Sequence, residues 1–116
     1  MIGRIRSAAT FERLAREGRV VRRGALEFRY LLDGGDGPPR VAFAVPRRAG
    51  SAVVRNRLRR RLRAVMRELG DPARGPTFPS GDYLIRPRRN AASISFGRLR
   101  EDAAAVLARV CGGGSS

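Results

Sequence analysis

The spacing of apolar residues along the chain predicts three amphipathic helices. The first, residues 7–18, places its apolar residues at helical spacing between a predicted N-cap, Ser7, and a predicted stop, Gly18. Residues 51–70 and 93–110 show the same periodicity over longer stretches. The apolar stripe of the last helix consists of Leu99, Ala103, Val106, Leu107 and Val110. Each helix therefore has one face suited to a core.

Alternation of apolar and polar residues predicts four strands. Residues 19–23 form the first strand and residues 25–33 the second. One face of the second strand carries Leu26, Phe28, Tyr30 and Leu32. Its opposite face is polar, with Arg29 at the centre, so one face is expected to be buried and the other wet. Residues 41–45 are apolar on both faces, as in a central strand, and residues 82–87 form the fourth strand.

The order of these elements is α-β-β-β-α-β-α, which predicts an α+β sandwich in which helices pack on a four-stranded sheet. The middle helix is then the crossover between the third and fourth strands. A chain of 116 residues is long enough to bury one core and too short for two. We therefore expect a single domain over residues 1–110, followed by a flexible Gly/Ser tail over residues 111–116.

The middle helix divides into an apolar arc and a basic surface. At about 100° per residue, the apolar arc contains Val54, Leu58, Leu62, Val65, Met66 and Leu69. The remaining surface is nearly all polar and basic, with a row of Asn56, Arg60, Arg63 and Arg67 flanked by Arg57, Arg59 and Arg61. Ser51 is placed to cap this helix and Gly70 to end it.

The net charge makes nucleic acid the leading class of partner. The formal net charge is +15 and the sequence pI is about 11.9, and a field of this sign attracts polyanions. Residues 37–67 contain ten arginines and no acid. Like charges one helical turn apart repel by roughly 0.2–0.5 kcal/mol per pair. The clustering of arginines on one helix therefore suggests that a bound anion offsets this repulsion. A merely solvated face is the alternative. Membrane binding is less favoured, because the apolar arc is committed to the core.

The residue inventory excludes several kinds of catalytic and metal site. The chain has no histidine and Cys111 is its only cysteine, so it cannot by itself form a disulfide, a zinc finger or a Cys-His nucleophilic pair. Its carboxylates are few and scattered, and we expect no catalytic and no metal-binding residue. Asp33 and Asp36 are interpreted as parts of a turn. No apolar run is long enough to span a membrane, so a cytoplasmic protein is expected.

The stretch "GSAVVRNRLRRRLRAVMRE", residues 50–68, resembles the signature segment of the protein subunit of bacterial ribonuclease P. Members of that family carry a Gly-Asn-Ala-Val-x-Arg-Asn-Arg core followed by alternating apolar and basic residues. One departure is Ser51, where the family usually has Asn, and both residues can cap a helix. The resemblance extends to "TFERLAREGR", "RVAFAVPRRAG" and "DYLIRPRR", so it covers nearly the whole chain.

This resemblance implies a function in tRNA processing. The implied partners are a catalytic RNA, with one protein per RNA, and precursor tRNA, from which the 5′ leader is removed. The RNA would perform the hydrolysis with bound Mg²⁺, while the protein positions RNA and substrate. The resemblance also implies a left-handed βαβ crossover through the middle helix, although parallel crossovers in general are right-handed.

Carried onto this sequence, the family's motif marks two sets of residues. The set that would bind the catalytic RNA is Arg47, Arg48, Arg55, Asn56, Arg57, Arg59, Arg60, Arg63 and Arg67. Arginine binds phosphate through paired N–H groups, and an asparagine can add a hydrogen bond to the RNA backbone or to a base edge. The set that would line a leader-binding cleft between the first helix and the sheet is Phe11, Tyr30, Phe28 and Arg88.

The leader-binding set departs from the family pattern. A second aromatic residue often found on the first helix is replaced by Ala15. Either Phe28 or Tyr30 could be the strand aromatic that faces the leader. Burial in an ordinary core is the alternative for Phe11, Phe28 and Phe43, and Tyr30 could serve either role.

Three other functions fit parts of the sequence. A ribosomal or other structural RNA-binding protein of this architecture would use the same arginine helix without a role in processing. A DNA-binding helix is less favoured, because neither a helix-turn-helix partner nor dimerising heptads accompany it. An independent metal-dependent nuclease would have to be active without RNA.

Overall fold

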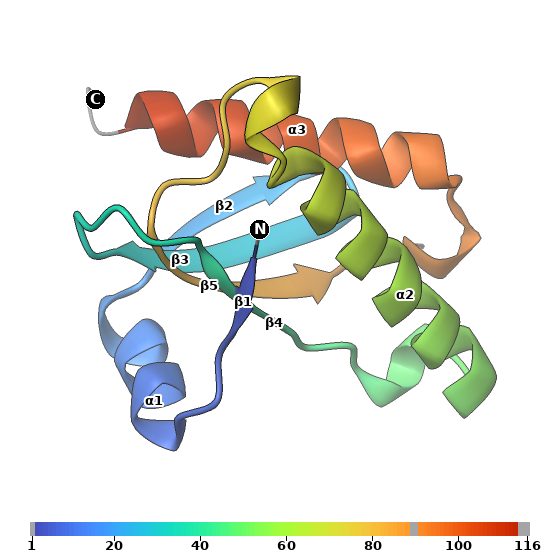
Figure 1. The fold of residues 1–116 in the computed structure, drawn as a ribbon. Helices are drawn as coiled ribbons and strands as arrows, with labels where there is room; N and C mark the ends of the chain where they lie inside the picture. The colour runs from blue at the N-terminus through green and yellow to red at the C-terminus, as the bar shows by residue number, and fades with distance from the viewer. Residues whose placement is uncertain (1, 89–90, 114–116) are drawn as a thin grey trace.

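The computed structural model describes residues 2–88 and 91–113, which form one five-stranded sheet and three α-helices (Figure 1). The strands are β1 (Gly3–Arg4), β2 (Arg19–Arg23), β3 (Leu26–Leu32), β4 (Arg40–Phe43) and β5 (Gly81–Pro87). The α-helices are α1 (Ala8–Glu17), α2 (Ala52–Leu69) and α3 (Phe96–Gly113). Short 3₁₀ turns are η1 (Arg47–Ala49), η2 (Pro72–Arg74) and η3 (Ala91–Ser93). The predicted α+β class is confirmed.

Strand β5 lies at the middle of the sheet, whose strand order is β1-β4-β5-β3-β2. It pairs antiparallel with β3 and parallel with β4. At the two edges, β1 runs parallel to β4 and β2 runs antiparallel to β3. The segment β4-α2-β5 is therefore the parallel crossover that the element order predicts. Its left-handed sense stays a prediction from the resemblance.

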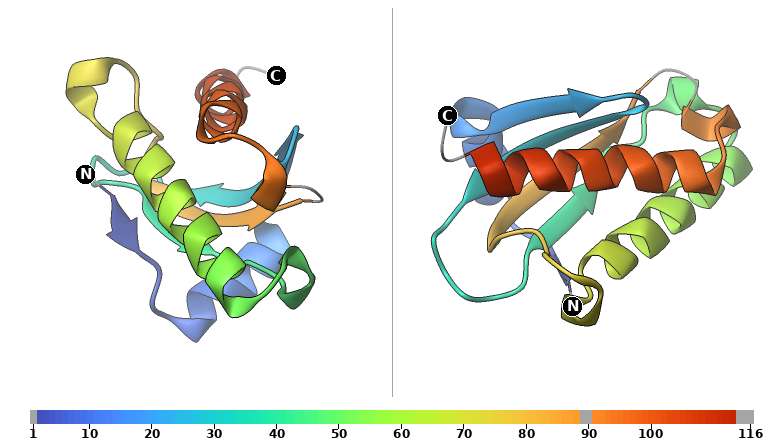
Figure 2. Two further views of the ribbon diagram at one scale, coloured as in Figure 1. Left: turned by 90° about the vertical axis from the view of Figure 1, so that its right-hand side faces the viewer. Right: turned by 90° about the horizontal axis from the view of Figure 1, so that it is seen from above.

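The helices are divided between the two faces of the sheet, with α2 and α3 on one face and α1 on the other (Figures 1 and 2). The main core lies between the sheet and the α2/α3 pair. Its most completely buried members include Leu26, Phe28, Leu58, Leu62, Val65, Met66, Tyr83, Ile85, Leu99 and Val106. Ile5 and Leu14 are also buried but lie outside this cluster, and Leu14 is the buried residue of α1.

Two helix starts agree with the sequence. The Ser7 side chain accepts a hydrogen bond from the Ala9 amide (3.2 Å), and the Ser51 side chain accepts one from the Val54 amide (3.3 Å). Each cap satisfies a backbone donor that the first helical turn leaves without a partner. Both predicted caps are confirmed.

The sheet has one strand more than the four predicted. Strand β1 is only two residues long, too short to show an alternating pattern, and it is held by pairing with β4. The expectation for Leu32 was also wrong, because this residue is 43 % exposed. It ends β3, where the chain turns into the loop that leads to β4.

The C-terminal boundary differs from the expected one. Helix α3 continues through residues 111–113, so the expected tail begins no earlier than residue 114. Residues 114–116 lie outside the described part of the chain. Helix propensity weakens at glycine, but a helix already packed on a sheet can extend over such residues because tertiary contacts dominate its stability.

The turn between β2 and β3 is fixed by a side chain from α3. Gly24 has φ of +52°, and its Cβ position is filled by the carboxylate of Asp102. That buried carboxylate accepts a hydrogen bond from the Ala25 amide (3.1 Å). A larger residue at Gly24 would therefore meet both backbone strain and a steric clash.

We expect Leu58→Ala to lower the free energy of unfolding by about 2–5 kcal/mol, because Leu58 is 1 % exposed and faces the core. Urea denaturation measures this value. The matched control is Arg60→Ala on the exposed side of the same helix, which should change it by less than about 0.5 kcal/mol. Equal stabilities for the two variants would contradict the orientation of α2.

Candidate nucleic-acid interface

Helix α2 carries a basic face, defined here as Asn56, Arg57, Arg60, Arg63 and Arg67. Its opposite side is fixed in the core by Leu58, Leu62, Val65 and Met66. Asn56, Arg57, Arg60 and Arg67 are exposed, whereas Arg63 is partly buried. The predicted division of this helix into an apolar arc and a basic surface is thus confirmed, and the core fixes which residues point outward.

Several polar side chains of α2 are held by neutral contacts. The Arg59 guanidinium donates to the side-chain oxygen of Asn56 (3.0 Å), and the Arg61 guanidinium donates to the carbonyl of Ile94 (3.4 Å). The Arg63 guanidinium lies over the ring of Phe43, 5.8 Å from its centroid. Such contacts orient the guanidinium groups without cancelling their charge.

No arginine of α2 forms an ion pair with a carboxylate within residues 2–88 and 91–113. In the same part of the chain, the buried Nε of Arg55 has no hydrogen-bond partner. The one acid of α2, Glu68, pairs with Arg100 (2.8 Å) and Arg74 (3.3 Å) beyond the end of the basic face. The basic face therefore keeps its charge available for an outside anion.

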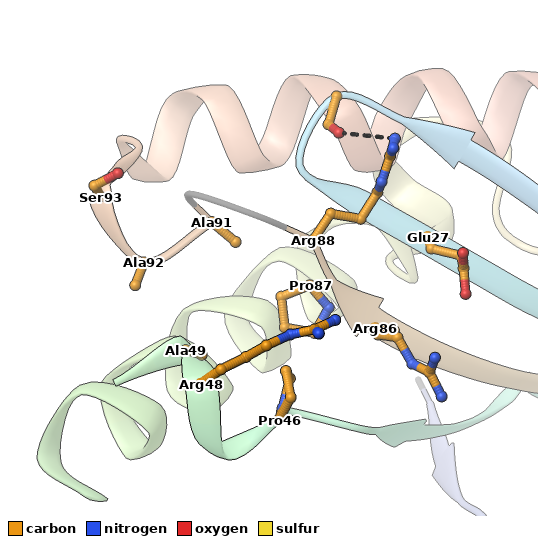
Figure 3. A pocket seen from close by; sticks show the side chains of 11 residues that line it. Glu27, Pro46, Arg48, Ala49, Arg86, Pro87, Arg88, Ala91, Ala92 and Ser93 are labelled. Atoms are coloured by element: carbon orange, nitrogen blue, oxygen red, sulfur yellow. Dashed lines mark hydrogen bonds between the residues drawn. The ribbon is translucent and has the colours of Figure 1, made fainter. Parts of the chain in front are cut away.

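An open hollow of about 920 Å³ lies where β4 and β5 end, and we call it the strand-end hollow (Figure 3). Arg48 enters it from η1, and Arg86 and Arg88 enter it from β5 and the residue after it. Arg88 donates to the carbonyl of Gly24 (3.4 Å). Among the described residues, the only acid that lines the hollow is Glu27, which is already paired with Arg22 (2.7 Å), so the hollow is suited to an anion.

The strand-end hollow brings together residues that the sequence assigned to two different RNAs. Arg48 belongs to the set expected to bind catalytic RNA, and Arg88 to the set expected to bind the leader. Arg47 is exposed on η1 but does not line the hollow. Arg86 was missed by the sequence reasoning. Its position in β5 could have identified it. Ile85 and Pro87 on either side are both buried, so alternation along the strand directs Arg86 to the opposite, exposed face.

The placement of Phe28 and Tyr30 in a leader-binding cleft is wrong. Phe28 is 0 % exposed and stacks on Phe78 at 5.7 Å, and Tyr30 is 5 % exposed and stacks on Tyr83 at 5.9 Å. Both belong to the core beneath α2 and α3, whereas α1 lies on the other face of the sheet. Neither ring is available for a nucleic-acid base.

The α1 side of the sheet presents different residues. Phe11 on α1 is 38 % exposed, so one predicted cleft residue is accessible. On β3, the residue that alternation directs toward α1 is Arg29, which is partly buried. Its Cγ lies 2.8 Å from the position that a Cβ on Gly18 would take, so it packs against the end of α1. The sequence contained this signal, because Phe28 and Tyr30 flank Arg29 and point the other way.

Helix α1 is tied to the inner strands β4 and β5 by a network of four charged side chains. Arg40 on β4 binds Asp82 of β5 (2.8 Å) and Asp33 of the preceding loop (2.8 Å). Arg13 on α1 lies 3.7 Å from the other oxygen of Asp82. Hydrogen bonds from Arg40 and from the Gly35 amide lower the pKa of Asp33 from 3.8 to about 2. The hydrogen bond to Asp82 is the largest cause of a raised pKa for Arg40.

We expect this network to give a pH-dependent contribution to stability. A carboxyl whose pKa is lowered by folding stabilises the protein above its unfolded-state pKa, here 3.8, and that contribution is lost as pH falls through about 2. Wild type should therefore be more stable than Asp33→Asn near neutral pH, with a difference that shrinks below about pH 4. Urea denaturation across this range tests it. A difference independent of pH would exclude the charge of Asp33 as the cause.

Two kinds of site are absent from the part of the chain that the structure describes. Residues 2–88 and 91–113 contain no cluster of three or more His, Cys, Asp or Glu side chains that could hold a metal ion. Within the same residues, no helix has the length and apolar content needed to cross a membrane.

Comparison with known proteins gives consistent matches. The family model described as Ribonuclease P matches residues 3–111. The ribonuclease P protein component of Thermobifida fusca is 38% identical over 104 residues, covering 83% of this chain and 67% of that protein. The corresponding protein of Symbiobacterium thermophilum is 36% identical over 99 residues, covering 84% and 82%.

Solved structures share the fold. The ribonuclease P protein of Thermotoga maritima superposes with a TM-score of 0.77 at 25% identity, covering 92% of this chain and 96% of that one. The Staphylococcus aureus protein gives a TM-score of 0.75 at 21% identity, covering 92% and 95%. The arrangement of sheet and helices described above is thus the arrangement of these proteins.

Proposed function

We propose a function for this chain from its family, because it belongs to the ribonuclease P protein family, whose members are components of a tRNA-processing ribonucleoprotein. In this proposal the chain binds the catalytic RNA through the basic face of α2. It thereby assists removal of the 5′ leader from precursor tRNA. One protein would bind each catalytic RNA. The observation that carries this proposal is the row of arginines on α2 that have no carboxylate partner in the described residues.

The chemistry of the basic face suits an RNA backbone. Arg57, Arg60 and Arg67 are exposed and charged, and a guanidinium can donate two parallel hydrogen bonds to one phosphate. The side-chain oxygen of Asn56 accepts from Arg59, and within the described residues its NH₂ group has no partner, so that group can donate to a phosphate or base. Binding would remove the repulsion among these arginines and release counterions from the RNA.

The strand-end hollow and α1 are the proposed contacts for the precursor. Since Arg48, Arg86 and Arg88 share one hollow, a single stretch of phosphate backbone can contact all three. Phe11 supplies an exposed ring against which an unpaired base can stack. Arg29 adds a planar guanidinium on the α1 side of the sheet, which can also stack on bases.

In this proposal the hydrolysis is performed by the catalytic RNA with bound Mg²⁺. The carboxylates that share a neighbour are already engaged with arginine, since Asp33 and Asp82 bind Arg40 and Glu68 and Asp71 pair with Arg74. They do not fit a magnesium site. The protein's own contribution is to bind and orient the two RNAs.

The test is cleavage of a precursor tRNA with a 5′ leader at low Mg²⁺. The three reactions contain the organism's ribonuclease P RNA alone, this protein alone, and both together. Stimulation only in the combined reaction supports the proposal. Activity from the protein alone would indicate a protein nuclease. Tight RNA binding without stimulation would instead favour a structural RNA-binding protein.

A further inference from the structure

Strand β1 presents an arginine on the same side of the sheet as α2. In the parallel pairing of β1 with β4, Arg4 is the partner of Val41, so the two side chains leave the sheet on the same face. Val41 is buried in the core beneath α2 and α3. Arg4 is exposed, and in the described part of the chain it forms no ion pair with any of the acids.

The backbone on both sides of Arg4 is fixed. The Gly3 amide donates to the carbonyl of Pro39 (2.7 Å), and the Ile5 amide donates to the carbonyl of Val41 (3.1 Å). Ile5 is 7 % exposed, and Ile2 packs against the main core. Apolar anchors on either side of Arg4 therefore fix its backbone, so binding a ligand would cost little backbone entropy at this position.

Arg4 is also near the basic face of α2. Figures 1 and 2 show the start of β1 beside the C-terminal half of α2 in every view. Phe43, whose ring lies beneath the Arg63 guanidinium, is two residues along β4 from the partner of Arg4. One strand spacing and two residue rises place the Arg4 and Phe43 backbones roughly 8 Å apart. Because the Arg63 guanidinium lies over Phe43, the side chains of Arg4 and Arg63 can contact the same stretch of an RNA backbone.

We propose that β1 belongs to the RNA-binding surface, with Arg4 binding a backbone phosphate of the same RNA that covers the basic face of α2. This inference rests on the proposed function. The RNA-binding surface would then consist of two elements. Helix α2 would supply most of the charge, and strand β1 would mark where the surface ends at the sheet edge. An arginine on an edge strand also discourages edge-to-edge pairing with other chains, a role that needs no RNA.

The test compares the affinity of wild type and Arg4→Ala for ribonuclease P RNA across a series of salt concentrations. Loss of one phosphate contact should weaken binding and reduce the slope of log affinity against log salt by about 0.7–0.9. Arg4→Lys should keep most of the slope, because it keeps the charge. The control is Arg109→Ala on α3, which is exposed and unpaired within the described residues and removes the same charge. Its slope should equal that of wild type.

The outcomes separate this inference from the proposed function. If Arg63→Ala weakens binding but Arg4→Ala behaves like Arg109→Ala, the inference about β1 is wrong and the basic face of α2 stands. If wild type itself fails to bind the RNA, the proposed function fails and the inference fails with it. The thermal unfolding midpoint of Arg4→Ala is measured as a control. If it equals that of wild type, weaker binding by the variant is not caused by loss of the fold.

Discussion

Replacing Arg57, Arg60 and Arg67 together with alanine is expected to give the largest loss of RNA affinity that the structure predicts. All three side chains are exposed on α2, so each can contact phosphate and none supports the core. Each phosphate contact contributes roughly 0.7–0.9 to the slope of log affinity against log salt, so the triple variant should lose between about 2 and 3 units. Titration of ribonuclease P RNA at several salt concentrations measures the slope.

A matched control for this variant is available elsewhere on the molecule. Arg19, Arg23 and Arg109 are also exposed and lack ion pairs within the described residues, but they lie on β2 and α3. Replacing these three removes the same total charge. If both triple variants lose affinity equally, the RNA responds to the overall field of the protein and not to the basic face of α2.

Replacing Phe28 with alanine is expected to lower the free energy of unfolding by about 3–5 kcal/mol, because its ring is fully buried against Phe78. The free energy of unfolding of a typical domain is only about 5–15 kcal/mol, so this substitution would remove a large part of it. Chemical denaturation measures the loss. Under conditions in which the variant remains folded, its affinity for precursor tRNA should match that of wild type.

Phe11→Ala should show the reverse behaviour. Its ring is 38 % exposed, so removing it should affect stability much less than the change at Phe28. Stacking of an aromatic ring on a base contributes roughly 1–3 kcal/mol to binding, so Phe11→Ala should weaken the binding free energy for a substrate with a leader by about that amount. Mature tRNA without a leader is the control substrate. If Phe11→Ala binds both RNAs as wild type does, the ring has no role in leader binding.

Helical periodicity predicted more of the fold than of the site. The orientation of α2 followed from its sequence because a core-facing stripe repeats over four turns, and each added turn narrows the choice of phase. A strand of two residues has no comparable pattern. β1 exists because its amides pair with β4, which is a tertiary contact between residues far apart in the sequence.

The error at Phe28 and Tyr30 has a different cause. Alternation along β3 correctly grouped these residues with Leu26 on one face. It could not say which face α1 covers, because that depends on how the chain crosses from one layer to the other. The strand-end hollow was hidden for the same reason, since Arg48 and Arg88 are brought together only when β4 and β5 lie side by side.

The central position of β5 has a consequence for synthesis of the chain on the ribosome. β3 and β4 do not pair with each other, and both must wait for residues 81–87 to be translated and inserted between them. Until then the emerging polypeptide can pair only its β2–β3 hairpin and the short β1–β4 edge, while the ten arginines of residues 37–67 are already made. The nascent protein therefore carries the charge that we propose binds RNA before it has a complete sheet, inside a cell filled with ribosomal RNA.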